Sequence, residues 1–165
     1  MEGFGHIGLT VRDVERSLRF YQEVVGMRAS DLDRELNTTP NETTQVEPGS
    51  ELITVTSDAF DQLTNAHGTS IKYVNMRLPG GDFRLQLVEY IAGGDGQLEL
   101  SHARAGTVHM NFYVEDVDAK YKELVSRGDV DITSAIVQIT PSMRSFYVAD
   151  PDGVPIEFLQ ATPND

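Results

Sequence analysis

Four side chains at matching points of two similar segments form a set that could bind a metal ion. They are His6, Gln86, His109 and Glu157. Two imidazoles, one carboxylate and one amide oxygen suit iron(II), manganese, cobalt, nickel or zinc. Each residue has apolar neighbours in a strand-like segment, where a buried polar side chain needs a partner. We therefore predict that these four residues bind one divalent metal ion.

The argument for the two histidines is an internal repeat. The segment HIGLTVRDVERS, which begins at His6, resembles HMNFYVEDVDAK, which begins at His109. In both, Asp-Val follows the alternating residues and opens a helical pattern. Asp13 and Asp116 therefore stand where helix N-caps are expected. A histidine on one strand is weak evidence, but its recurrence at the start of both copies indicates a shared site.

The ends of the two copies also align. Residues 84–90, RLQLVEY, match residues 155–161, PIEFLQA, and this match pairs Gln86 with Glu157. Glu89 is a tempting ligand, but it aligns with Gln160. Residues three apart on a strand also point to opposite faces of the sheet. We therefore prefer Gln86 over Glu89 as the metal ligand.

The coarse pattern predicts the same five elements in each copy. In the first, they are strand 4–11, helix 13–25, strand 27–36, strand 71–78 and strand 83–90. In the second, they are strand 107–114, helix 116–127, strand 131–139, strand 143–149 and strand 154–161. Gly26 and Gly128 mark the expected helix ends. An insert of about 30–67 contains a possible short helix from Asp58 to Ala66, and 93–105 is a linker. The predicted fold class is α+β, one domain over 1–165 made of two tandem βαβββ modules, 1–92 and 106–165.

The amino-acid composition limits the classes of molecule that this protein is expected to bind. Thirteen basic residues against twenty-six acidic ones give a net charge of −13, which argues against nucleic acid and anionic membranes. Cysteine is absent, so a metal must have nitrogen and oxygen ligands. No apolar stretch approaches the length of a spanning helix, and no signal-like segment is recognised, so we expect a cytoplasmic protein with a small-molecule substrate. The arginines that could pair with an anionic group are interpreted as scattered surface residues; they are Arg77, Arg84, Arg104 and Arg144.

The chain resembles the vicinal-oxygen-chelate superfamily, which includes glyoxalase I, methylmalonyl-CoA epimerase, extradiol dioxygenases and bleomycin or fosfomycin resistance proteins. The resemblance covers nearly the whole chain except the insert. It rests on GHIGLTV at 5–11, SLRFY at 17–21, GTVHMNF at 106–112 and YVADPDGVPIE at 147–157. It implies that the two modules form a half-barrel around one metal site, and that the protein is a homodimer.

The ligand set resembles that of methylmalonyl-CoA epimerase, because glyoxalase I usually has Glu where this chain has Gln86. This resemblance implies a metal-dependent isomerase or lyase that removes a proton next to a carbonyl through a metal-stabilised enolate. The candidate bases are Glu47, Glu51 and Glu157 itself. One alternative is a non-heme iron(II) dioxygenase that uses the two histidines and Glu157 alone. Another is a metal-independent protein that binds a drug or natural product.

Overall fold

The structure, a computed structural model, describes residues 5–30, 44–46, 51–56, 58–64, 68–92, 96, 100 and 102–162. At 44–46, 59 and 60 only the backbone is described. The chain divides into two compact units, Met1–Gln97 and Leu98–Asp165, and each is described by itself. Among the described residues, no helix is long and apolar enough to cross a membrane.

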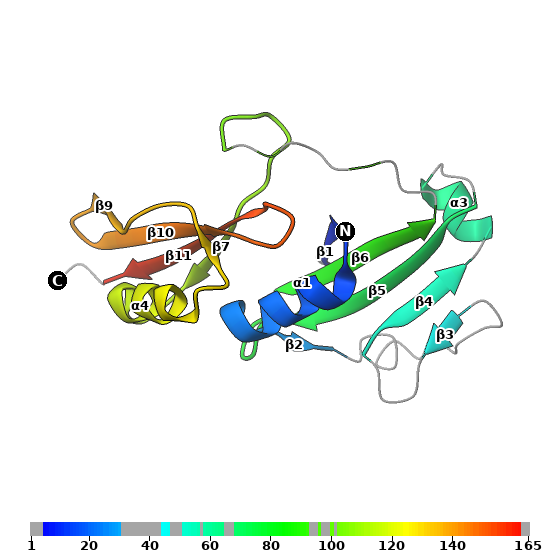
Figure 1. Cartoon of the computed structure of the whole chain (residues 1–165), viewed down its shortest axis with the longest axis horizontal. Helices are drawn as coiled ribbons and strands as arrows, with labels where there is room; N and C mark the ends of the chain where they lie inside the picture. Colours follow the sequence, from blue (N-terminus) through cyan, green and yellow to red (C-terminus); the bar gives the residue numbers. More distant parts are fainter. Residues whose placement is uncertain are drawn as a thin grey trace. The chain divides into compact units, whose positions relative to one another are not determined.

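The first unit is a six-stranded sheet with a helix alongside it (Figure 1). Its strand order is β1-β6-β5-β4-β3, and β2 also pairs with β5. β1 and β6 are parallel, and the other neighbours are antiparallel. The elements are β1 (Ile7–Val11), α1 (Val14–Phe20), the π-helix η1 (Tyr21–Val25), β2 (Arg28–Ala29), β3 (Thr44–Val46), β4 (Ile53–Thr56), α3 (Asp58–Thr64), β5 (Ser70–Arg77) and β6 (Arg84–Ala92).

The second unit repeats this plan with five strands in the order β7-β11-β10-β8, and β9 also pairs with β10. Its elements are β7 (Met110–Tyr113), α4 (Val117–Arg127), β8 (Asp131–Ile132), β9 (Val137–Thr140), β10 (Met143–Ala149) and β11 (Pro155–Ala161). As in the first unit, the first and last strands are parallel neighbours. The predicted α+β class with two tandem modules is therefore confirmed. The half-barrel concerns both units together and stays a prediction.

The helix boundaries follow the predicted caps. The carboxylate of Asp13 accepts a hydrogen bond from the Arg16 amide at 2.9 Å, and Asp116 accepts one from Ala119 at the same distance. These bonds satisfy amides that have no partner inside the helix. Gly26 and Gly128 end the two helical segments with φ of 86° and 72°, in the left-handed region that glycine adopts without strain.

The predicted second strand of each copy is not continuous. In the second unit it divides into β8 and β9, which pair with different stretches of β10. Between them the Thr133 amide donates to the Tyr147 carbonyl at 3.0 Å, and the Tyr147 amide donates to the Ser134 hydroxyl at 2.8 Å. β2 and β4 divide the edge of β5 in the same way. In the first unit β2 covers Arg28–Ala29, and residues 31–36 of the predicted strand lie outside the described residues.

Each sheet has one face against its helix and one face that we call the open face. On β6, Leu85 and Leu87 are fully buried and lie on the helix side. On β11, Ile156 and Phe158 do the same beside α4. Because side chains alternate along a strand, the intervening Gln86 and Glu157 point to the open faces. The buried apolar side chains of the core include Val14, Tyr21, Val74, Met76, Val117, Leu124, Phe146 and Val148.

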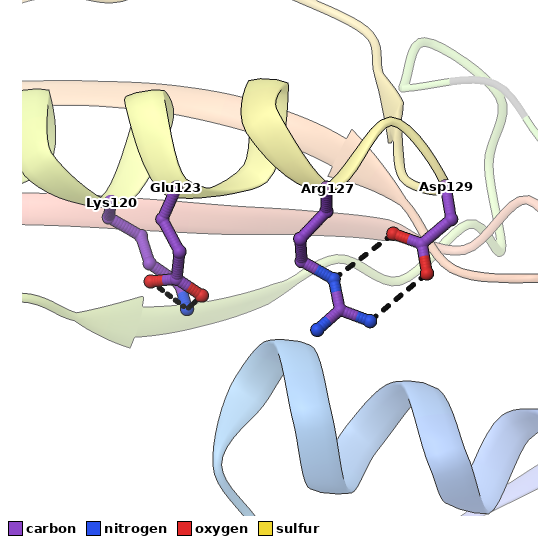
Figure 2. Close-up of polar contacts among 4 residues, drawn as sticks. All are labelled: Lys120, Glu123, Arg127 and Asp129. Atoms are coloured by element: carbon purple, nitrogen blue, oxygen red, sulfur yellow. Dashed lines mark hydrogen bonds and ion pairs between the residues drawn. The ribbon is translucent and has the colours of Figure 1, made fainter.

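Lys120 and Arg127 of α4 pair with carboxylates on the helix or just after it (Figure 2). The Lys120 ammonium lies 3.1 Å from the Glu123 carboxylate and also 5.3 Å from the centre of the Phe158 ring. Arg127 donates two hydrogen bonds of 3.0 Å to Asp129 just past the helix end. Exposed pairs such as these contribute little to stability, so they mainly neutralise this surface.

A further pair, between Arg144 of β10 and Asp118 of α4, predicts a pH-dependent contribution to stability. The guanidinium donates two hydrogen bonds, at 2.6 and 3.0 Å, and these lower the pKa of Asp118 below 3.8. A carboxylate with a lowered folded-state pKa stabilises the fold above its unfolded value and loses that contribution as the pH falls through the folded value. We expect Arg144→Leu to be slightly less stable than wild type near neutral pH, and this difference to shrink below pH 3.8. Urea unfolding at several pH values checks this, and the shrinkage should be absent in an Asp118→Asn background.

Candidate metal centre

The second unit brings two of the predicted ligands together on its open face. His109 lies one residue before β7, and Glu157 lies on β11, the parallel neighbour of β7. The His109 Nε2 atom is 3.9 Å from Glu157 Oε2. The Glu157 side chain is only 9% exposed, whereas the imidazole is 53% exposed. A buried carboxylate beside an accessible imidazole forms one side of a binding site.

Two residues lie opposite Glu157 on the neighbouring strands. Asn111, directly opposite it on β7, donates its Nδ2 to Glu157 Oε2 at 2.8 Å. Tyr147 lies directly opposite it on β10. Burial, and then the negative charge of Glu157, raise the pKa of Tyr147 above its usual value. The tyrosine therefore favours its neutral form beside this carboxylate.

Two imidazoles flank the Tyr147 ring. The His102 ring lies edge-on to it with a centroid distance of 4.6 Å, and the His109 ring lies edge-on at 5.9 Å. Aromatic pairs with this geometry are favourable by about 0.5–1.5 kcal/mol beyond their burial. His102 lies in the turn that leads to β7 and is exposed. These contacts keep the tyrosine and the His109 ring in a defined arrangement beside Glu157.

The other two predicted ligands lie on neighbouring strands of the first unit. Gln86 pairs with Gly8 on β1 and with Asn75 on β5. Its Nε2 donates to Asn75 Oδ1 at 3.1 Å, so its Oε1, the atom that could bind a metal, is outside this bond. His6 is exposed and precedes Gly8 by two residues. Gln86 thus lies on the open face of β6, and His6 lies one residue before β1, the parallel neighbour of β6.

The structure therefore places the predicted ligands as two pairs, one in each unit. Among the described residues, no three or more His, Asp or Glu side chains gather in a group that could hold a metal ion. Of the candidate bases, Glu157 lies in the second-unit pair. Glu51 is exposed, and its Oε2 accepts a hydrogen bond of 3.2 Å from Gln22 of η1, on the helix side of the first sheet. Glu47 lies outside the described residues.

Glu89 and the equivalent Gln160 of the second unit instead accept hydrogen bonds from amides at the start of the two helices. Glu89 Oε2 accepts a hydrogen bond from the Val14 amide at 2.9 Å, and Gln160 Oε1 accepts one from the Val117 amide at 3.2 Å. Each bond joins the last strand of a unit to the first turn of its helix. The preference for Gln86 as a ligand agrees with this engagement of Glu89.

This role of Glu89 leads to a prediction that separates it from Gln86. Glu89→Ala removes the acceptor for the Val14 amide, so the free energy of unfolding should fall by about 0.5–2 kcal/mol, as for other lost helix caps. Metal affinity should not change. Glu89→Gln keeps an acceptor and serves as the matched control. Urea unfolding and metal titration of both variants check this, and a loss of metal binding in Glu89→Gln would show that Glu89 is a ligand.

Some of the contacts around the ligands were not predicted from the sequence. Asn75, Asn111, Tyr147 and His102 are not among the residues that the sequence pattern predicts at the site. The available signal was position: Asn111 and Asn75 lie directly opposite Glu157 and Gln86 in the register of the sheets.

The second-unit pair fits a divalent metal. Two ligands at about 2.0–2.2 Å from one ion lie roughly 3–3.5 Å apart, and the His109–Glu157 separation of 3.9 Å is close to this. Metal-binding carboxylates are usually oriented by a hydrogen-bond donor, as Asn111 orients Glu157 here. The first-unit pair supplies an imidazole and a free amide oxygen, which are compatible ligands for the same group of metals.

Known proteins share this fold over the whole chain. A glyoxalase family protein from Bacillus cereus has a TM-score of 0.74 at 15% identity, covering 99% of this chain and 96% of that one. The trypanothione-dependent glyoxalase I of Leishmania major has a TM-score of 0.52 at 20% identity, covering 94% and 84%. The uncharacterised protein YwbC of Bacillus subtilis (strain 168) is 23% identical over 156 residues, 94% of each chain.

The family comparison agrees with the repeat, the strand order and the open-face residues. The model of the glyoxalase/bleomycin resistance protein/dioxygenase superfamily matches residues 3–158, which include all four predicted ligands. This chain belongs to the glyoxalase/bleomycin resistance protein/dioxygenase superfamily.

Proposed function

We propose that this protein is a metal-dependent isomerase or lyase that removes a proton from the carbon next to a carbonyl of a small molecule. The proposed ligands are His6, Gln86, His109 and Glu157, and the metal is cobalt, nickel, zinc, manganese or iron(II). The observation that carries the proposal is the His109–Glu157 pair, in which a buried and oriented carboxylate lies 3.9 Å from an accessible imidazole. Membership of the superfamily supports a metal-dependent function of this general kind.

A divalent ion bound by these residues would act as a Lewis acid toward a substrate carbonyl. The remaining steps belong to the protein. Glu157 is the proposed base, because its buried carboxylate lies beside the accessible His109 imidazole, where a substrate could reach it. Asn111 holds Oε2 through its hydrogen bond, and Tyr147 lies opposite the same residue on β10. Glu51 remains a second candidate, although its carboxylate is bonded to Gln22.

The orientation of Gln86 favours this reaction over the iron(II) dioxygenase. A dioxygenase of the two-histidine, one-carboxylate type needs only three protein ligands. Here Gln86 lies opposite Asn75, which takes its amide nitrogen and leaves the amide oxygen for the metal. A fourth protein ligand at the metal is expected for the proposed isomerase or lyase. The homodimer and the cytoplasmic location remain expectations.

Isotope exchange tests the reaction type. The metal-loaded protein is incubated in deuterated water with small 2-oxo acids, 2-oxo aldehydes and thioesters that carry an acidic α-proton. The proposal expects deuterium at the α-carbon without oxygen consumption, and no exchange after the metal is removed. Oxygen consumption with iron(II) would favour the dioxygenase. Tight binding of a compound without metal or exchange would favour the drug-binding alternative.

A further inference from the structure

Three arginines lie side by side across the first sheet. Arg28 of β2 pairs directly with Arg77 of β5, and Arg77 pairs directly with Arg84 of β6. Neighbouring strands are about 5 Å apart, so the row spans roughly 10 Å. Directly paired residues point to the same face of a sheet, and all three side chains are exposed. Three positive charges thus share one short line on one face.

That face is the open face, beside the first-unit ligands. Arg84 precedes Gln86 by two residues on β6, which places it about 7 Å away along the strand. Arg77 follows Asn75, the partner of Gln86, by two residues on β5. On the neighbouring strand Ile7 pairs with Leu85, and His6 and Arg84 each lie one residue before this pair. The arginine row therefore borders both first-unit ligands.

The module fold does not require arginines at these positions. In the second unit Asp131, Ala149 and Pro155 are paired across β8, β10 and β11 in the same way. These residues carry one negative charge and no positive charge. The second unit therefore serves as an internal comparison, in which the same strand junction forms without a cationic row.

Among the described residues, no counterion is paired with the arginine row. The chain has twenty-six acidic and thirteen basic residues. Arg127 and Arg144 each form a two-bond pair with an aspartate. Within the part of the chain that the structure describes, no carboxylate forms an ion pair with any arginine of the row. Like charges placed directly opposite each other on a sheet destabilise it. The row of like charges lowers stability, and no described carboxylate neutralises it. Such a row is suited to binding an anion.

We propose that Arg28, Arg77 and Arg84 form a binding site for an oxyanion group of the substrate, with a preference for a dianionic phosphoryl or phosphonyl group over a single carboxylate. Guanidinium groups bind such oxygens through paired hydrogen bonds, and three positive charges suit a double negative charge. The anion site itself requires only the arginines. Assigning it to the substrate rests on the proposed function, because it depends on Gln86 and His6 binding the reacting end.

The test uses metal-free protein and inorganic phosphate, so its result does not depend on the metal. Isothermal titration at low ionic strength compares wild type with Arg77→Leu, which removes the central charge. Phosphate affinity should fall by about tenfold or more, since a charge-assisted hydrogen bond is worth that much or more. The matched control is Arg19→Leu, which removes the same charge from the exposed side of α1 and should leave phosphate binding unchanged. Acetate should bind more weakly than phosphate to wild type.

The unfolding temperature provides a second measurement, which distinguishes anion binding from a purely structural role of Arg77. Without phosphate, Arg77→Leu should unfold at the same or a higher temperature than wild type, because it removes like-charge neighbours. Phosphate should raise the unfolding temperature of wild type but not that of the variant. If Arg77→Leu does not fold, Arg84→Leu undergoes the same measurements. Equal phosphate binding by wild type and the row variant, or equal losses in Arg77→Leu and Arg19→Leu, would overturn the anion site. Metal binding and isotope exchange without phosphate binding would leave the proposed function standing and remove only this inference.

Discussion

Glu157→Gln is expected to weaken metal binding by about a hundredfold or more, and to abolish metal-dependent proton exchange. Glu157 is the only negatively charged member of the proposed ligand set, and its side chain is buried. Even the residues that orient a metal ligand are worth about ten- to a hundredfold in affinity, so loss of the charged ligand itself should cost at least as much. Calorimetric titration with cobalt(II) or manganese(II) measures the change.

The variant should remain folded, which makes its result interpretable. A glutamine oxygen can still accept the hydrogen bond from Asn111 at the position of Glu157 Oε2. Glu89→Gln is the matched control, since it makes the same substitution on the helix side of the other sheet, where the oxygen caps α1. Metal affinity equal to that of wild type in Glu157→Gln would show that the metal binds elsewhere.

His6→Ala is expected to reduce metal affinity as strongly as His109→Ala, with one ion bound per chain in the wild type. The two histidines occupy equivalent positions before β1 and β7, and they belong to different units. If both are ligands of one ion, removing either leaves the same number of ligands. Titration of the two variants gives the affinities and the stoichiometry.

His102→Ala is the control for the histidine pair. This imidazole packs against Tyr147 but is not one of the proposed ligands, so its loss should have a much smaller effect on metal affinity. If His6→Ala bound metal as well as wild type does, the ion would be held by the second unit without the first. Two ions per chain would also contradict a shared site.

Local rules were sufficient to predict most of the fold. Asp13 and Asp116 are helix caps, and Gly26 and Gly128 end the helical segments, because these residues meet local backbone requirements. The equivalence of Gln86 and Glu157 was predicted because the repeat places each at the same point of the last strand of its unit. The sheet registers agree with it: Gln86 lies opposite Gly8, and Glu157 lies opposite Asn111.

The details that could not be predicted depend on contacts between strands distant in sequence. Asn111 and Glu157 are 46 residues apart, and only the register of β7 and β11 makes them neighbours. The arginine row is a stronger example, because Arg28, Arg77 and Arg84 come from three strands and were interpreted as scattered or were not considered. The break in the second strand also escaped prediction, since it depends on how Tyr147 bonds to residues 133 and 134.

The most direct test of the proposed metal centre is a crystal structure of the protein loaded with cobalt(II) or manganese(II), with the ion located by its anomalous scattering. We expect one ion per chain at about 2.0–2.3 Å from His109 Nε2 and a Glu157 carboxylate oxygen, with His6 and the Gln86 Oε1 completing the protein ligands. Those last two ligands can come from the same chain or from a second copy. An ion bound by other residues, or no ion at Glu157 under saturating metal, would contradict it.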